Sequence, residues 1–237
     1  MKIALIGYGK MGKTIERLAI ERGHEIVARY NSQNPYNLDS ICNADVAIEF
    51  SRPDLVVNHI KTAITNKLPL VVGTTAWSEY LNEIRILIEQ QEGSLVYASN
   101  FSIGVNIFEQ LTAQLATLLT KHAQYNLSID ETHHLQKLDA PSGTAVSLAE
   151  TILTNHSAYS QWELTPVLNN ESLPITAHRL PDVPGTHVIQ AVSAIDTITL
   201  THEAHNRDGF ALGSILAAEF LLGKTGIFTM KDVLKLN

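Results

Sequence analysis

The side chains best suited to chemistry are concentrated in one segment, residues 131–145. Two adjacent histidines, His133 and His134, precede Lys137, and two carboxylates accompany them. Histidine gains and loses a proton near neutral pH, while lysine supplies both a positive charge and a proton. Together these residue types predict proton transfer to a small, negatively charged substrate.

The same segment ends in a Ser-Gly-Thr turn, Ser142 to Thr144, at the start of an expected helix. Gly143 and Thr144 can present backbone N–H groups at a helix N-terminus, where a carboxylate binds well. The alternative is a solvated loop in which Asp139 or Ser142 caps the helix. Such a loop does not require adjacent histidines beside a lysine, so we favour a site for a small dianion.

A glycine-rich turn lies near the N-terminus. It follows the apolar run 2–6, opens the amphipathic segment 11–22 and has the spacing G-x-G-x-x-G. The first glycine allows a tight turn, the second lets a pyrophosphate approach the backbone, and the third lets the helix pack closely on the strand. The turn predicts dinucleotide binding, and an ordinary strand–helix turn is the alternative. Its residues are Gly7, Tyr8, Gly9, Lys10, Met11 and Gly12.

The second predicted strand ends without the acidic residue that commonly binds the ribose of NAD. Its last residues are Ala28-Arg29-Tyr30-Asn31. Arg29 either reaches a 2′-phosphate or is an ordinary surface arginine, and the sequence leaves both interpretations open.

Hydrophobic periodicity predicts the scaffold that positions these motifs. In the first half of the chain, short apolar runs alternate with longer amphipathic ones, which indicates a parallel, doubly wound sheet. The expected strands are 2–6, 25–29, 45–49, 70–72 and 94–98, and the expected helices are 11–22, 53–66 and 78–90. The crossover over residues 30–45 has room for little more than one helical turn.

After residue 104 the pattern changes to a mixed α+β module. Long helices are expected at 105–123 and 142–154, and strands at 126–131, 186–193 and 196–202. A stretch punctuated by prolines separates the second helix from the last two strands. A helix at 210–222 and a short element at 227–236 follow.

Composition excludes several classes of protein. Of the 237 residues, 45% are hydrophobic and only 17% charged, against about 25% charged in an average soluble protein, which excludes intrinsic disorder. A formal charge of −7 without any Lys/Arg run argues against nucleic-acid binding. The lone Cys42 leaves no intramolecular disulfide, and no apolar stretch suits a signal peptide or a membrane span. We therefore expect a soluble cytoplasmic protein.

Residues 131–145 resemble the signature E-x-H-H-x-x-K-x-D-x-P-S-G-T-A of the dihydrodipicolinate (4-hydroxy-tetrahydrodipicolinate) reductases of lysine and diaminopimelate biosynthesis. Further segments agree with that family along almost the whole chain. They are the glycine turn, Glu49-Phe50-Ser51, Gly73-Thr74-Thr75, residues 98–106, and Arg207, Phe210 and Gly213 at the spacing R-x-x-F-x-x-G. One departure is Ser99, which stands where the family usually has a proline.

The resemblance implies a reaction and a role for each matching residue. The implied reaction is the NAD(P)H-dependent reduction of 4-hydroxy-tetrahydrodipicolinate to tetrahydrodipicolinate. His133 would be the proton donor and acceptor, and Lys137 a second proton donor. The residues implied to hold the substrate carboxylates are His134, Gly143 and Thr144.

The resemblance also adds residues to the expected cofactor site. Compact members of the family often have an acidic residue where the neutral Asn31 stands. We therefore expect NADPH or NADH to serve, with NADPH equal or modestly preferred, since Arg29 or Lys10 would supply positive charge near a 2′-phosphate. The alternative is a ribose hydrogen bond from Asn31, which would leave NADH preferred. The other residues implied to bind the cofactor are Phe50, Gly73, Thr74, Thr75, Ala98, Ser99, Asn100, Phe101 and Arg207.

The implied fold is a Rossmann-like dinucleotide-binding domain completed by the C-terminal segment, with an inserted α+β domain that has a mixed sheet. The first domain would comprise residues 1–103 and 209–237. Residues 104–208 would bind substrate and mediate tetramerisation. The expected assembly is a homotetramer, consistent with the apolar excess of the composition.

Other functions remain possible on the sequence alone. An amino- or imino-acid dehydrogenase, such as an aspartate dehydrogenase, would share the scaffold but would not need the complete segment 131–145. A non-catalytic nicotinamide-binding sensor would have no need for His133 and Lys137 together. His202 and His205 suggest a polar strand end better than a metal site, because on a strand they point to opposite faces. No metal is expected.

Overall fold

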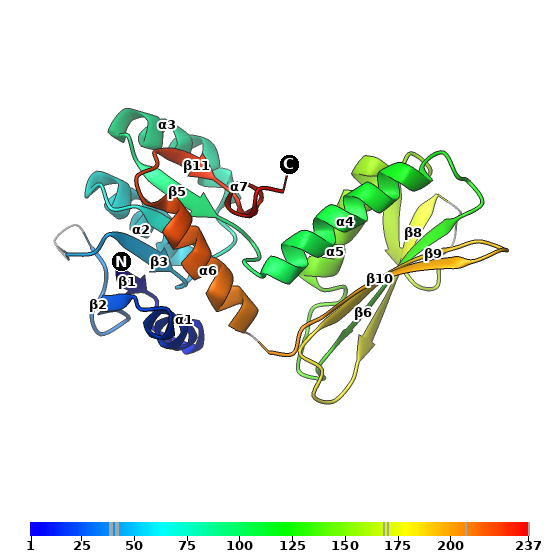
Figure 1. Cartoon of the computed structure of the whole chain (residues 1–237), viewed down its shortest axis with the longest axis horizontal. Helices are drawn as coiled ribbons and strands as arrows, with labels where there is room; N and C mark the ends of the chain where they lie inside the picture. The colour runs from blue at the N-terminus through cyan, green and yellow to red at the C-terminus, as the bar shows by residue number, and fades with distance from the viewer. Residues whose placement is uncertain (38–39, 41–42, 168, 170, 207, 237) are drawn as a thin grey trace. The chain divides into compact units, whose positions relative to one another are not determined.

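The computed structural model describes residues 1–37, 40, 43–167, 169, 171–206 and 208–236. The chain divides into two compact units, one formed by Met1–Ile103 with Asp208–Asn237 and the other by Gly104–Arg207 (Figure 1). Each unit contains its own sheet and its own hydrophobic core. The predicted fold class, a Rossmann-like parallel sheet plus a second, mixed sheet, is confirmed.

The first unit is built on a six-stranded sheet in which every neighbouring pair is parallel. The strand order is β11-β5-β4-β3-β1-β2, so the C-terminal segment adds the edge strand beside β5 (Figure 1). The strands are β1 (Lys2–Ile6), β2 (Glu25–Tyr30), β3 (Val46–Glu49), β4 (Leu70–Val72), β5 (Ser94–Tyr97) and β11 (Gly226–Phe228).

Helices cover both faces of this sheet because its strands alternate their side chains between two cores. Ile3 and Leu5 pack in the core that includes α1 and α6, whereas Ala4 and Ile6 pack in the core that includes α2 and α3. The helices are α1 (Lys10–Glu21), α2 (Pro53–Thr65), α3 (Leu81–Gln91), α6 (Asp208–Leu221) and α7 (Met230–Leu234), with a 3₁₀ turn η1 (Ser78–Tyr80) before α3. In the described part of the crossover between β2 and β3 there is no helix, whereas the sequence left room for little more than one helical turn.

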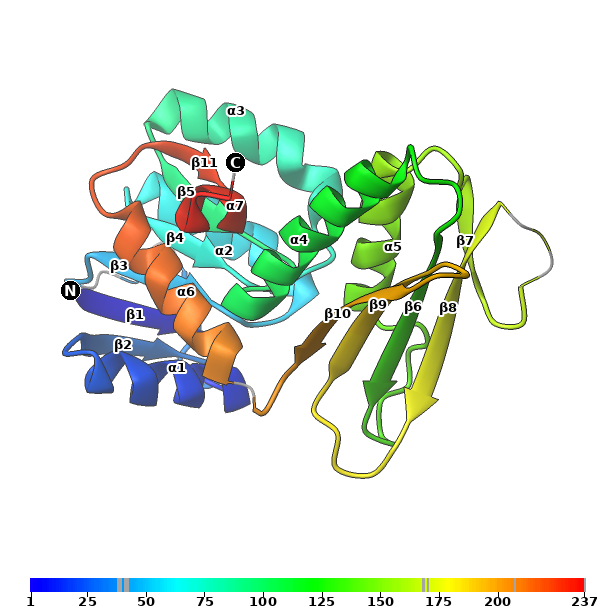
Figure 2. The same ribbon diagram turned by 45° about the vertical axis from the view of Figure 1, so that its right-hand side comes forward.

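The second unit is built on a five-stranded mixed sheet with the order β10-β9-β6-β8-β7. β8 runs parallel to β6 and β7, whereas β9 runs antiparallel to β6 and β10. The strands are β6 (Asn126–His133), β7 (Gln161–Leu164), β8 (Ser172–Arg179), β9 (Thr186–Val192) and β10 (Thr197–Glu203). Two helices, α4 (Ile103–Leu119) and α5 (Gly143–Asn155), share a core with one face of the sheet (Figure 2).

Strands β7 and β8 were not predicted, because Pro174 interrupts the pattern of the second one. A proline lacks the N–H that a sheet ladder needs and normally argues against a central strand. Here the ladder between β6 and β8 begins at Ile175, one residue beyond the proline. On its other side, Pro174 lies opposite Glu163 within the β7–β8 ladder.

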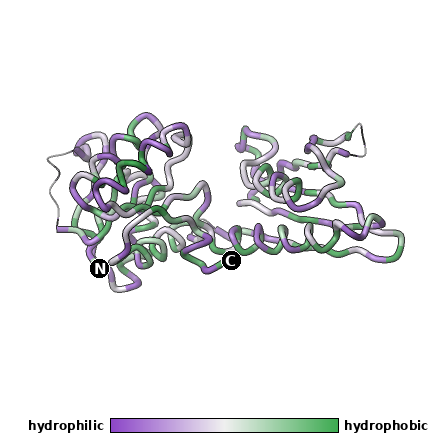
Figure 3. The backbone as a smooth tube through the Cα atoms, turned by 90° about the horizontal axis from the view of Figure 1, so that it is seen from above, coloured by the Kyte–Doolittle hydropathy of each residue, from purple (hydrophilic) through white to green (hydrophobic). Residues whose placement is uncertain are grey.

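Hydropathy along the chain agrees with this layered arrangement. Hydrophobic and hydrophilic residues alternate along the helices of both units (Figure 3), as expected of helices that cover one face of a sheet. Among the described residues, none of the helices combines the length and the apolar character needed to cross a membrane.

Candidate active site

The predicted chemistry of residues 131–145 begins on the helix-covered face of the mixed sheet. Along β6 the buried side chains alternate, and the first two, Leu127 and Ile129, belong to the hydrophobic core. Because successive side chains of a strand point to opposite faces, Glu131 and His133 lie on this same face, closer to the end of the strand. Along this face of β6, apolar core residues are thus followed by the polar residues of the site.

Two neighbouring strands add polar residues to the same face. On β9, His187 pairs in register with Glu131 and precedes the core residue Ile189 by two positions. On β8, Arg179 pairs with His133 and follows the core residue Ile175 by four positions. Even spacing keeps each of them on the core side of its strand.

The carboxylate of Glu131 is the centre of this cluster, and it is fully buried. Its Oε2 is hydrogen-bonded to Nδ1 of His133. Its Oε1 accepts hydrogen bonds from Nη1 of Arg179 at 3.0 Å and from the backbone N–H of Ser142 at 3.2 Å. Burial alone raises the pKa of the Glu131 carboxyl, but the hydrogen bonds from His133 and Arg179 outweigh burial and hold the pKa below its ordinary value. The group is therefore an anion that orients the histidine.

His133 presents its other ring nitrogen to a confined space. The ring of His187 packs edge-on against it, with ring centroids 5.1 Å apart. A Cβ atom placed on Gly185 would lie 3.0 Å from Nε2 of His133. The absence of a side chain at Gly185 therefore keeps room beside Nε2, the ring nitrogen that is not bonded to Glu131.

Lys137 lies in the loop between β6 and α5, and Arg179 supports that loop. Nζ of Lys137 is 2.8 Å from Oδ2 of Asp139, and this contact is the main cause of the lowered pKa of the Asp139 carboxyl. Arg179 donates to the backbone oxygens of Lys137 at 3.3 Å and of Asp139 at 2.5 Å. One guanidinium thus joins the loop of Lys137 to the carboxylate that holds His133.

The loop ends at the N-terminus of α5. Ser142 is the N-cap residue, and its Oγ accepts a hydrogen bond from the backbone N–H of Ala145 at 3.2 Å. Gly143 and Thr144 form the first turn of the helix, as predicted from the Ser-Gly-Thr pattern. His134 directly follows β6, and its Nδ1 is buried without a hydrogen-bond partner among the described residues. The hydrogen bond from the Ser142 N–H connects this turn to Glu131. His134 and Thr144 are close in sequence to His133 and Ser142, respectively.

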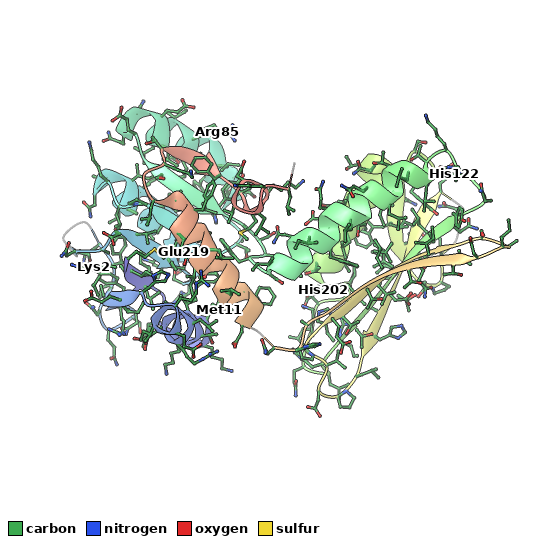
Figure 4. The ribbon with its side chains drawn as sticks, viewed as in Figure 1. Lys2, Met11, Arg85, His122, His202 and Glu219 are labelled. Atoms are coloured by element: carbon green, nitrogen blue, oxygen red, sulfur yellow. The ribbon has the colours of Figure 1, made fainter. Side chains whose placement is uncertain are left out.

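The cluster contains three groups of the kind that bind metals. Ligand atoms of Glu131, His133 and His187 all lie within 4.8 Å of one another. Both carboxylate oxygens already accept hydrogen bonds from protein donors, and the Arg179 guanidinium stands at 3.0 Å. A positive charge at that distance disfavours a divalent cation. His202, which the sequence analysis weighed as a metal ligand, lies on β10 (Figure 4), and its ring packs against the ring of Phe108.

The predicted cofactor residues of the first unit meet at one edge of its sheet. The last residues of the strands are in register, Ile6 with Tyr30 and Glu49, and Val72 with Glu49 and Tyr97. The segments that follow them therefore begin side by side, at Gly7, Asn31, Phe50, Gly73 and Ala98. The strand order reverses at β1, where dinucleotides bind in folds of this class.

The glycine turn has the geometry that a dinucleotide requires. Gly7 has φ +94°, and a Cβ there would lie 2.0 Å from the backbone oxygen of Phe50. A Cβ on Gly12 would lie 2.5 Å from the oxygen of Gly7, whereas none of the described atoms lies within 4 Å of a Cβ on Gly9. The first and third glycines are thus needed for packing, and the second faces open space, which fits a pyrophosphate at the start of α1. Lys10 and Met11 begin α1, and Met11 is labelled in Figure 4.

At the end of β2, Arg29 is an exposed arginine, as one of the two sequence interpretations has it, and it is paired with an acidic residue. Its guanidinium is hydrogen-bonded to Glu16 of α1, with Nε 2.9 Å from Oε1, and the hydroxyl of Tyr8 is bonded to the other carboxylate oxygen. The hydrogen bond from Arg29 is the largest cause of the lowered pKa of the Glu16 carboxyl. Asn31 closes a turn, since its Oδ1 accepts from the N–H groups of Gln33 and Asn34 at 2.8 and 3.1 Å.

The other predicted cofactor segments are held by close backbone packing. A Cβ on Gly73 would lie 2.1 Å from the ring of Phe50. Oγ1 of Thr74 accepts from the N–H of Ser51 at 2.8 Å, and the ring of Phe101 packs on Phe50 with centroids 5.8 Å apart. These contacts bring the 50, 73–75 and 101 segments together. Thr75, Ala98, Ser99 and Asn100 belong to the same edge.

Comparison with known proteins defines the family. A family model described as dihydrodipicolinate reductase, N-terminus, matches residues 1–101, and one described as dihydrodipicolinate reductase, C-terminus, matches residues 104–234. The chain belongs to the dihydrodipicolinate reductase family. As a member it is an oxidoreductase, and the family implies a nicotinamide cofactor.

Relatives cover nearly the whole chain. A protein of Christiangramia forsetii named 4-hydroxy-tetrahydrodipicolinate reductase is 44% identical over 234 residues, which cover 99% of this chain and 98% of the relative. A protein of Rickettsia rickettsii with the same name is 36% identical over 235 residues, 96% of each chain.

Solved structures share the fold. A dipicolinate-bound dihydrodipicolinate reductase from Paenisporosarcina sp. TG-14 has a TM-score of 0.82 at 24% identity and covers 97% of both chains. An aspartate dehydrogenase from Thermotoga maritima has a TM-score of 0.50 at 15% identity, over 96% of this chain and 99% of the other. At these sequence identities, both comparisons show a shared fold only.

Sequence reasoning missed several residues of these clusters. Glu131 was recognised only as one of two carboxylates, while Arg179 comes from a strand that was not predicted. Glu16 and His187 carried no local signal, because a lone residue on a helix or strand has no motif. The predicted cofactor residue Arg207, like Cys42, lies outside the described residues.

Proposed function

We propose that this protein reduces 4-hydroxy-tetrahydrodipicolinate to tetrahydrodipicolinate in the diaminopimelate route of lysine biosynthesis, with NADPH or NADH as the reductant. The observation that carries the proposal is the buried Glu131–His133 pair beside Lys137 and the first turn of α5. A two-proton relay next to a carboxylate-binding turn suits a cyclic imine dicarboxylate better than it suits a substrate with one carboxylate.

In this proposal His133 donates and accepts protons through Nε2. Glu131 accepts the hydrogen bond of Nδ1, which fixes the tautomer and the orientation of the ring.

Lys137 is the second proton donor. Its ammonium group, 2.8 Å from Asp139, stands in the loop supported by Arg179. A cation there favours the electron-rich intermediate formed when the imine carbon is reduced, and such general acid help is typically worth ~10²–10⁴-fold in rate.

The substrate carboxylates bind at the first turn of α5 and at His134. Gly143 and Thr144 stand where the helix presents N–H groups and a partial positive charge. Ser142 cannot serve in the same way, because its N–H is already bonded to Glu131 and its Oγ caps the helix.

The nicotinamide cofactor binds along the carboxyl edge of the six-stranded sheet. When bound it supplies the hydride. Gly7 to Gly12 hold the pyrophosphate, and Phe50, Gly73–Thr75 and Ala98–Phe101 line the nicotinamide end. The open space beside Gly9 and the tight packing of Gly7 support this assignment.

Both NADH and NADPH serve, with NADPH equal or modestly preferred. Arg29 brings positive charge to the end of β2, but Glu16 neutralises part of it. Asn31 adds no negative charge that would repel a 2′-phosphate.

Asn31→Asp tests this preference cleanly, because an aspartate keeps the oxygen acceptor that closes the turn. The added charge costs a 2′-phosphate about 1 kcal/mol at a wet surface, or roughly fivefold in the ratio of kcat/KM values toward NADH. Asn82→Asp, on the exposed surface of α3, is the control for added charge. A wild-type enzyme that prefers NADH tenfold, with no change in Asn31→Asp, contradicts the proposal.

We also propose a cytoplasmic homotetramer assembled through the mixed sheet. Apolar side chains on and between β9 and β10 are exposed, among them Val192 at 41% and Ile195 at 89%. A subunit interface would remove such surface from water. Light scattering in solution should give four times the chain mass, and a monomer would contradict the assembly.

The reaction is tested by following the absorbance of reduced nicotinamide with freshly generated cyclic imine. We expect consumption that depends on the imine and that pyridine-2,6-dicarboxylate inhibits in competition with it. Aspartate with oxidised cofactor is the matched control for a dehydrogenase. Turnover of aspartate without turnover of the imine would overturn the proposed function.

A further inference from the structure

We propose that His187 is a positioning residue that couples the proton-transfer group His133 to the carboxylate-binding turn at the start of α5. The proposal rests on the proposed function, because it assigns His187 a part in the same site. Neither the signature segment 131–145 nor any other motif of the sequence includes this histidine.

The position of His187 connects two strands and a helix. It is 4% exposed, sits opposite Glu131 in the β6–β9 ladder and packs edge-on against the ring of His133. Its Nε2 is 3.1 Å from Oγ of Ser142, the N-cap residue of α5. It is thus in contact with both parts of the site, the histidine and the turn.

In this proposal the Ser142 hydroxyl donates and Nε2 of His187 accepts. Oγ accepts the N–H of Ala145, so its own O–H is available as a donor, and Nε2 of His187 is the ring nitrogen within reach. His187 then acts as an acceptor, which requires a neutral ring. Burial, followed by the charge of nearby His133, lowers the pKa of His187 to about 4, in agreement with a neutral ring.

Ser142 carries the effect of His187 to the rest of the site. Its hydroxyl is bonded to His187 while its backbone N–H is bonded to Glu131 at 3.2 Å. Losing the acceptor at His187 therefore frees the Ser142 hydroxyl to rotate and loosens the turn that presents Gly143 and Thr144. Dicarboxylate affinity and KM should change more than kcat.

Two amide substitutions that differ by one methylene group place the acceptor at different depths of the site. The amide oxygen of Gln can reach the place of Nε2, whereas that of Asn reaches only the place of Nδ1. His187→Gln should therefore bind pyridine-2,6-dicarboxylate within about twofold of wild type, and His187→Asn about three- to tenfold more weakly, the range of one neutral hydrogen bond. Calorimetry at saturating reduced cofactor gives the affinity, and steady-state kinetics give KM and kcat.

A mutant cycle with Ser142→Ala provides the second arm. Because the two residues share one hydrogen bond, His187→Asn should add less than twofold to the loss already caused by Ser142→Ala. His156→Asn, another buried histidine that lies at the C-terminal end of α5, is the control and should leave affinity unchanged. The affinity for the reduced cofactor should be the same in all variants.

The outcomes are distinct. Equal affinities for the Gln and Asn variants, or full additivity with Ser142→Ala, would overturn the role of His187 while wild-type turnover of the imine continues. If His187→Asn does not fold by circular dichroism, His187→Met takes its place, because methionine has nearly the length of glutamine but no amide oxygen at the place of Nε2. Equal affinities of the Met and Gln variants would then overturn the role of His187. Wild-type protein that neither binds the dicarboxylate nor reduces the imine would overturn the proposed function and this proposal together.

Discussion

Replacing Glu131 with glutamine should separate the chemistry of the site from its packing. Glutamine has the same shape and still offers one oxygen to Arg179 and to the N–H of Ser142, which lie at 3.0 and 3.2 Å in the wild type. It loses the negative charge, and its amide replaces the oxygen that accepts from His133. The ring then loses its fixed tautomer and the anion that orients it.

The expected cost to stability can be estimated from the surroundings of Arg179. Breaking a buried ion pair by removing one partner typically costs ~3–5 kcal/mol. The Arg179 side chain keeps 19% exposure and also donates to the backbone oxygens of Lys137, His178 and Asp139. We therefore expect a smaller loss, about 2 kcal/mol in the free energy of unfolding, measured by urea denaturation.

The expected cost to activity is larger. A histidine that loses its orienting anion should transfer protons roughly 10²-fold more slowly, so kcat should fall by about that factor at saturating substrate and cofactor. Asp130→Asn, the adjacent residue on the opposite face of β6, is the control and should keep kcat. If Glu131→Gln keeps kcat within threefold of wild type while losing stability, Glu131 is structural and our account of His133 is wrong.

Two further predictions concern the carboxylate-binding turn at the start of α5 and the pH dependence of stability. Thr144→Val keeps the backbone N–H but deletes the hydroxyl, so the affinity for pyridine-2,6-dicarboxylate should fall by about 1–2 kcal/mol. Unchanged inhibition would show that the Thr144 hydroxyl does not bind the carboxylate. The folded-state pKa of His187, about 4, lies below its ordinary value of 6.5, so the unfolded chain binds the proton first and stability is lost as pH falls from 6.5 toward 4. His187→Gln cannot titrate, so the stability of the wild type relative to this variant should fall by about 3 kcal/mol across that window in urea denaturation. A constant difference would show that His187 is not buried as described.

Most of the fold could be predicted from the sequence, because hydrophobic periodicity and turn residues determine most of its helices and strands. The apolar run 2–6 predicted a buried strand, and the structure buries it between two cores, Ile3 and Leu5 in one and Ala4 and Ile6 in the other. Pro53 opens α2 and Ser142 caps α5, in agreement with their propensities. Strands β7 and β8 escaped prediction because Pro174 interrupts the pattern of β8, although the ladder between β6 and β8 begins one residue beyond it.

The candidate site was predictable only where it is contiguous in the chain. His133, Lys137, Gly143 and Thr144 come from one segment whose residue types carry the signal. Arg179 and His187 come from strands that pair with β6, so their proximity depends on sheet register, which a single sequence does not encode locally. The same limit applies to Glu16, whose contact with Arg29 changes the charge expected at the ribose.

Turnover of Lys137→Met tests the central claim most directly. Methionine keeps the length of the side chain but removes the ammonium group that lies 2.8 Å from Asp139. Reduction of the freshly generated cyclic imine should fall by ~10²–10⁴-fold, while the dissociation constant of the reduced cofactor stays nearly unchanged. Lys121→Met, on the exposed surface of the same unit, should keep wild-type turnover. If Lys137→Met retains more than about a third of wild-type turnover, the lysine is not a proton donor and the account of the site is contradicted.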